Sequence, residues 1–116
     1  MPAALAHLLF VATLWLGLGW ATHGHAQSSP LPAWTITVRD GVFAPKRVEV
    51  PAGQRIKFIL KNEGPGPLEF ENADLHVEKI VAAGAESFVV FKLPPGEHMF
   101  VDEFNIATGE LLVIAK

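Results

Sequence analysis

The chain has 116 residues, which is enough for one domain, and its 12 Asp and Glu outnumber its 9 Lys and Arg, giving a formal net charge of −3. Nucleic acids and anionic membrane surfaces select basic proteins, so this balance argues against both as partners. The chain contains no Cys, which excludes disulfides and lipid attachment through a cysteine.

The beginning of the chain is typical of an export signal. An apolar run over 8–20 is followed at 24–26 by Gly-His-Ala, a small-x-small cleavage pattern. The run is too short for a comfortable membrane span. The sequence therefore predicts a signal peptide over 1–26, a linker over 27–33 and one domain over 34–116. After cleavage the product is expected to be soluble in the periplasm and not membrane-anchored.

Short runs with a period of two fill the rest of the chain. Residues 34–38, 56–61 and 68–72 alternate between apolar and polar side chains, and Gly- or Pro-rich turns separate such runs. Residues 87–93 are apolar at both parities, as in a strand covered on both faces. Residues 73–81 fit one helical turn or a strand equally well. The pattern predicts an all-β fold, an antiparallel sandwich of about seven strands with Greek-key connections.

Catalysis finds little support in the sequence. No Ser is paired with a base in a nucleophile motif, and no Gly-rich loop of the phosphate-binding kind is present. The turn at 64–67 holds two prolines, which removes N–H groups that such a loop would need. We therefore expect that the protein is not an enzyme.

Two segments carry a family resemblance. Residues 43–64 contain F-x-P, then V-P-A-G, then a strand ending in Asn-x-Gly, and residues 95–109 contain P-G-x-H-x-F and a closing Gly. Together they resemble the cupredoxin superfamily, which implies a Greek-key β-sandwich. More narrowly, 68–79 and 102–111 are similar to the EfeO-type cupredoxin-like family. That resemblance implies a periplasmic accessory of high-affinity iron or other metal uptake, with an iron permease or other uptake components as partners.

The resemblance fails at the positions that hold copper in blue-copper proteins. Leu68 follows the Pro where the first His would stand, and Asp102 and Asn105 replace the Cys and the second His. A type 1 site needs a thiolate to set its geometry and potential. We therefore expect no blue-copper centre and no electron transfer through this corner.

The remaining polar residues suggest a different metal site. In a cupredoxin fold, the loop after residue 62 and the end of the strand through residue 100 meet at one pole, where carboxylates and one imidazole would suit a divalent or trivalent ion such as iron or copper. The candidate ligands are Glu69, Glu71, His76, Glu78, Asp102 and Glu103.

In a simpler interpretation the acidic residues lie on a solvated face. Glu71, Glu78 and Glu103 would then form salt bridges with Lys79, Arg39 or Arg55. The protein would then be a metal-free interaction module of the same fold. His98 shares the parity of the apolar Phe100, so it is predicted to be a buried, hydrogen-bonded side chain rather than a ligand, whereas Met99 is predicted to be exposed.

Overall fold

The structure is a computed structural model and describes residues 17, 19 and 30–116. The predicted signal peptide therefore falls almost entirely outside the described residues and stays a prediction. Residues 30–32 of the predicted linker have no regular structure, and the first strand begins at residue 33. Within the described part of the chain, no helix is both long and apolar enough to cross a membrane.

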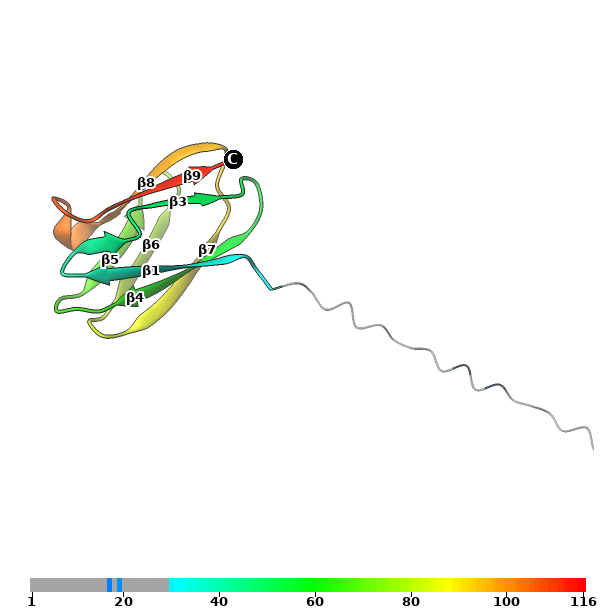
Figure 1. Cartoon of the computed structure of the whole chain (residues 1–116), viewed down its shortest axis with the longest axis horizontal. Coiled ribbons are helices and arrows are strands. Elements are labelled where there is room, and N and C mark those ends of the chain that lie inside the picture. Colours follow the sequence, from blue (N-terminus) through cyan, green and yellow to red (C-terminus); the bar gives the residue numbers. More distant parts are fainter. Residues whose placement is uncertain (1–16, 18, 20–29) are drawn as a thin grey trace, which may run out of the picture.

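Nine strands form two packed sheets, which confirms the predicted β-sandwich (Figure 1). The first sheet has the order β2-β1-β4-β7 and the second the order β3-β9-β8-β5-β6. A short 3-10 helix, η1, follows β8. The element bounds are β1 Ala33–Arg39, β2 Val42–Ala44, β3 Arg47–Val50, β4 Ile56–Asn62, β5 Leu68–Asn72, β6 Val77–Val81, β7 Glu86–Phe91, β8 Gly96–Asp102, η1 Glu103–Asn105 and β9 Glu110–Ala115.

The sheets are mixed rather than purely antiparallel. β1 pairs parallel with β4, and β3 pairs parallel with β9, whereas the other pairs are antiparallel. A parallel pair cannot be joined by a tight hairpin. Here the chain leaves the first sheet after β2, forms β3 in the second sheet, and returns to lie beside β1 in the same direction as β1.

The segment that fitted either a helical turn or a strand is divided between a turn and a strand. Residues 73–76 form a turn, and β6 follows from residue 77. His76 has a φ of 55°, in the left-handed region. Asp74 and His76 therefore do not continue the alternation that places Glu78 on one face of the strand.

The core lies between the sheets and is rich in phenylalanine. Phe58 makes edge contacts with Phe70 and Phe91, and Phe70 stacks on Phe100 with 4.9 Å between ring centroids. Such aromatic pairs add stabilisation beyond their buried area. On β5 the burial alternates, with Leu68 and Phe70 fully buried, so the glutamates between and after them lie on the outer face of the second sheet.

Candidate functional site

Asp102 ends β8 and is buried, with 1% of its surface exposed. One carboxylate oxygen, Oδ1, accepts hydrogen bonds from the backbone N–H of Glu69 and of Phe104, each at 3.1 Å. The other, Oδ2, accepts one from the Asn105 amide at 2.9 Å. A buried carboxylate is tolerated when donors surround it in this way. Asp102 therefore joins β5, β8 and η1, and its oxygens are already engaged.

The corner around Asp102 is closely packed. A Cβ placed on Gly109 would lie 2.6 Å from the Cβ of Asp102, and one on Gly41 would lie 2.5 Å from the Cβ of Asn105. The Thr108 hydroxyl donates to the Gly41 carbonyl at 3.0 Å. These contacts fix the loop that follows η1 against the turn between β1 and β2.

The same corner does not fit a type 1 copper ion. Leu68 is fully buried and has no donor atom, Asp102 is saturated by three N–H donors, and the Asn105 amide nitrogen is directed at that carboxylate. No thiolate is available anywhere in the chain. In this chain, hydrogen bonds stabilise the corner at which a blue-copper protein would bind its copper ion.

Four of the six predicted ligands lie together on the outer face of the second sheet. Glu71 is directly opposite Glu78 on β6 and opposite Val101 on β8, and Glu103 begins η1 where β8 ends. Like charges directly opposite one another in a sheet are destabilising. We call this group the acidic patch; it consists of Glu69, Glu71, Glu78 and Glu103.

Partial desolvation, together with the neighbouring carboxylates, raises the pKa of two glutamates in the acidic patch. Partial desolvation raises the pKa of Glu69 above its usual 4.5, and the hydrogen bond and charge of Glu78 add to the rise. Desolvation also raises the pKa of Glu71, followed by the charge and hydrogen bond of Glu103. In both cases the neighbouring carboxylates disfavour the ionised form.

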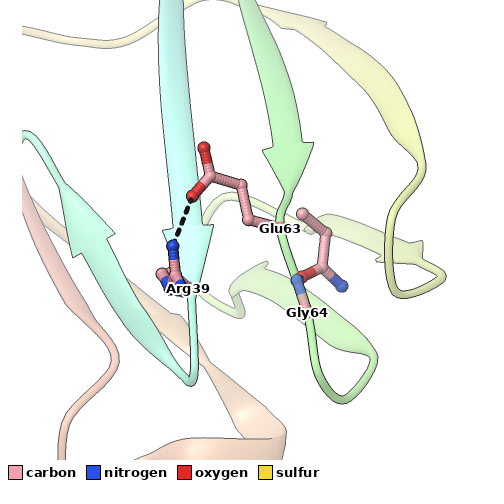
Figure 2. Close-up of polar contacts among 4 residues, drawn as sticks. Arg39, Glu63 and Gly64 are labelled. Atoms are coloured by element: carbon pink, nitrogen blue, oxygen red, sulfur yellow. Dashed lines mark hydrogen bonds and ion pairs between the residues drawn. The ribbon is translucent and has the colours of Figure 1, made fainter.

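The predicted salt bridges to this group are wrong. Among residues 30–116, the ion pairs within 4.0 Å join Glu49, Glu63 and Glu86 to basic side chains, and none reaches the acidic patch. Arg39, one expected partner, pairs instead with Glu63 at 4.0 Å, beside the turn at Gly64 (Figure 2). The negative charge of the acidic patch is therefore uncompensated within the described part of the chain.

The other two predicted ligands are placed differently. Asp102 is directed into the corner described above, and His76 is an exposed residue in the turn before β6. Over residues 17, 19 and 30–116, no three His, Asp or Glu side chains are arranged so that they could hold a metal ion as they stand. The six residues do not form one preorganised coordination sphere.

A hollow of about 390 Å³ beside the acidic patch includes residues that the sequence interpretation did not assign to a site. Glu71 and Glu103 line it together with Glu97 and Met99 of β8. Glu97 and Met99 are two residues apart on one strand, so their side chains lie on the same face of the sheet. The alternation of the strand could therefore have identified them from the sequence. The predicted exposure of Met99 is confirmed at 45%, and His98 is hydrogen-bonded to the Pro94 carbonyl at 2.7 Å but is only half-buried.

Comparison with known proteins agrees with this architecture. Residues 8–113 match the family described as Cupredoxin-like domain. The chain belongs to this family. The cupredoxin-like fold is also that of the metal-binding domain of the Cu(I)-exporting P-type ATPase CopA of Streptococcus pneumoniae. The two superpose with a TM-score of 0.62 at 11% identity, over 72% of this chain and 84% of that one.

Two relatives are similar in sequence to this cupredoxin-like chain. An uncharacterised protein of Rickettsia prowazekii is 35% identical over 82 residues, which are 70% of this chain and 66% of that protein. The copper-resistant cuproprotein CopI of Pseudomonas aeruginosa is 31% identical over 83 residues, 63% of this chain and 46% of that protein. This chain thus spans between about half and two thirds of their lengths. Neither relative bears the EfeO name, so the narrower resemblance stays a prediction.

The raised pKa of Glu71 predicts that the melting temperature of a Glu71→Gln variant differs from that of the wild type in a pH-dependent way. A carboxyl whose folded-state pKa is raised favours folding when protonated, and this contribution is lost as the pH rises through the folded pKa. We therefore expect Glu71→Gln to melt at a higher temperature than wild type at pH 7, and the difference to vanish below the ordinary pKa of 4.5. Glu63→Gln is the matched control, because Glu63 faces Arg39 and should show no gain. Melting curves between pH 3.5 and pH 8 measure both, and equal melting temperatures at pH 7 would contradict the repulsion.

Proposed function

We propose that the protein is an exported cupredoxin-like accessory of metal handling, which holds a cation at the acidic patch and passes it on without electron transfer. The observation that supports this is the gathering of four carboxylates with no basic partner in the described part of the chain. Carboxylate oxygens suit hard and borderline cations, and a bound cation would relieve the repulsion between them. The lack of a preorganised ligand set favours exchangeable binding over storage.

The cargo and the setting follow from two different resemblances. The EfeO-type similarity of 68–79 and 102–111 favours iron, with a permease or another uptake component as partner. The relationship to a protein named a copper-resistant cuproprotein favours copper. The small-x-small site at 24–26 favours the periplasm as the place of action. In this proposal the chain carries no catalytic residues.

A metal-free interaction module is the second candidate function. The finding that favours it is that the described carboxylates are not arranged as a coordination sphere. In that case the acidic patch would meet a basic surface on a partner protein, and electrostatic attraction would accelerate the encounter. The two functions differ in whether a metal ion alone stabilises the protein.

Thermal unfolding with Cu(II), Fe(II), Zn(II) and Mn(II) separates the two candidates. A cation that binds only the folded state raises the melting temperature by mass action, and more so at higher metal concentration. We expect such a shift for at least one of these metals in the wild type, a reduced shift in Glu71→Gln and Glu103→Gln, and an undiminished shift in Glu63→Gln.

The Cu(II)-loaded protein should lack an intense visible thiolate band because the chain has no Cys.

Two results would count against metal binding at the acidic patch. If no metal shifts the melting temperature of the wild type, the metal-free module is the function that remains. If the shift persists undiminished in a Glu71→Gln/Glu103→Gln double variant, the cation binds elsewhere on the molecule.

A further inference from the structure

The outer side of β7 is a sheet edge that pairs with no other strand of the described chain. β7 closes one end of the order β2-β1-β4-β7 and pairs only with β4 (Figure 1). Natural edge strands are usually protected by charges, prolines or bulges within the strand. β7 has one charged residue, Glu86 at its start, and its remaining residues, Ser-Phe-Val-Val-Phe at 87–91, include no charge and no proline. This edge is therefore open to pairing.

The hydrogen bonds at the start of β7 show which backbone groups face outward. The N–H of Asn62 donates to the Ala85 carbonyl at 3.0 Å, and the N–H of Gly84 donates to the Asn62 carbonyl at 2.8 Å. Backbone groups of successive residues alternate between the two sides of an antiparallel strand. Residues 87, 89 and 91 thus direct their N–H and C=O toward β4, and Phe88 and Val90 direct theirs to the open side.

The side chains along this edge are apolar and incompletely covered. Phe88 is 54% exposed on the outer face of its sheet, although the Lys57 ammonium lies 4.3 Å from the centre of its ring. Val89 and Phe91, which point toward the core, are only partly buried. A strand laid against β7 would cover both sets of side chains.

We propose that β7 pairs antiparallel with β7 of a second copy of this chain, around a twofold axis at Val89. In this register Phe88 lies opposite Val90 of the second copy. Glu86 lies opposite Lys92 of the second copy, and both contacts occur twice because the interface is isologous. All four residues have the parity of the outer face, so the two sheets continue into one.

The charges select this register and this partner. Lys92 is exposed directly after β7 and makes no ion pair within 4.0 Å to any residue of 30–116. Glu86 is exposed and only loosely paired, 3.8 Å from Lys61. An axis at Phe88 would place Glu86 opposite an apolar Val90 and Lys92 opposite Gly84, without charge complementarity. Opposite charges directly across a strand pair are stabilising, so the strand is complementary to itself.

Sedimentation velocity over a concentration series up to about 1 mM tests the proposal, since an interface made of one strand pair is small and the dimer weak. We expect a reversible monomer–dimer equilibrium. Glu86→Lys and Lys92→Glu should each weaken dimerisation about tenfold, because each places two like-charged pairs across the axis. The double charge swap should restore it, as expected for residues in direct contact. Val42→Lys, at the opposite edge of the same sheet, is the matched control and should leave the equilibrium unchanged.

A proline variant tests the strand pairing itself. Val90→Pro removes an N–H that faces the open side, which an edge strand tolerates. It should abolish the dimer while circular dichroism shows a folded β protein; if the variant does not fold, the charge swap decides alone. A protein that stays monomeric at every concentration would overturn the proposal. So would a dimer that is indifferent to the charge reversals, because its interface would then lie elsewhere.

Discussion

Replacing Asp102 by Ala is expected to lower the free energy of unfolding by about 3 kcal/mol. The carboxylate is buried, and the substitution leaves the backbone N–H groups of Glu69 and Phe104 and the Asn105 amide without their acceptor. A buried donor that loses its partner costs its full desolvation free energy. Denaturant unfolding followed by fluorescence measures the loss.

Two further substitutions make this test specific. Asp102→Asn retains an acceptor oxygen for the two backbone donors but presents an amide N–H₂ to Asn105, so its loss should be roughly half as large. Glu103→Ala, one residue further on and exposed, removes charge from the acidic patch and should not destabilise the fold. If Asp102→Ala unfolds within about 0.5 kcal/mol of the wild type, the corner does not depend on this carboxylate.

The distinction between Asp102 and the acidic patch explains how far the sequence could predict the site. The alternation of Leu68 and Phe70 with Glu69 and Glu71 is a local property of a strand, so period two placed these glutamates on the outer face correctly. From the local sequence alone, Asp102 cannot be distinguished from these acidic residues. Its burial depends on a backbone N–H 33 positions away, which no local pattern contains.

One local signal for Asp102 was nevertheless present. Asp is a preferred N-cap residue, and Asp102 accepts from the Phe104 N–H at the start of η1. An Asp directly before a short polar segment after an apolar strand indicates a cap as readily as a ligand. This signal predicts the capping role of Asp102 from the sequence alone, but it does not reveal the third donor, Asn105.

The parallel pairs illustrate the corresponding limit for the fold. Most strands were recognisable from their own residues, although about seven were predicted where nine form and 73–81 was left open between a helical turn and a strand. Strand direction, in contrast, depends on which sheet the intervening segment joins. β1 and β4 are parallel only because β3 crosses to the other sheet between them. That choice is made by packing between the two layers, where Phe58 of one sheet meets Phe70 of the other. Periodicity determines which face is buried and carries no information on direction.

The salt-bridge interpretation failed for a related reason. Lys79 is close to the acidic glutamates in sequence, yet it lies opposite Phe70 across the β5–β6 pair, on the other face of the sheet from Glu71 and Glu78. A shift of one residue changes the face on which a strand side chain lies. Proximity in sequence therefore favoured an ion pair that the pleat of the sheet forbids.

Gly109→Ala is expected to destabilise the protein by about 3 kcal/mol through overpacking of the same corner. The new methyl group would lie 2.6 Å from the Asp102 Cβ, 2.9 Å from the Asn105 carbonyl oxygen and 3.1 Å from the Gly41 carbonyl oxygen. Two of these three neighbours are backbone atoms, and Gly109 is held by its own hydrogen bond to Asn105 at 2.8 Å, so the site cannot relax outward. Gly66→Ala is the matched control: no atom lies within 4 Å of the added methyl, and its free energy of unfolding should stay within about 1 kcal/mol of wild type. Equal losses in the two variants would mean that the closed corner does not account for the effect. A larger loss in Gly109→Ala alone, measured by denaturant unfolding, would show that the contacts around Asp102 hold this pole of the fold together without a metal ion.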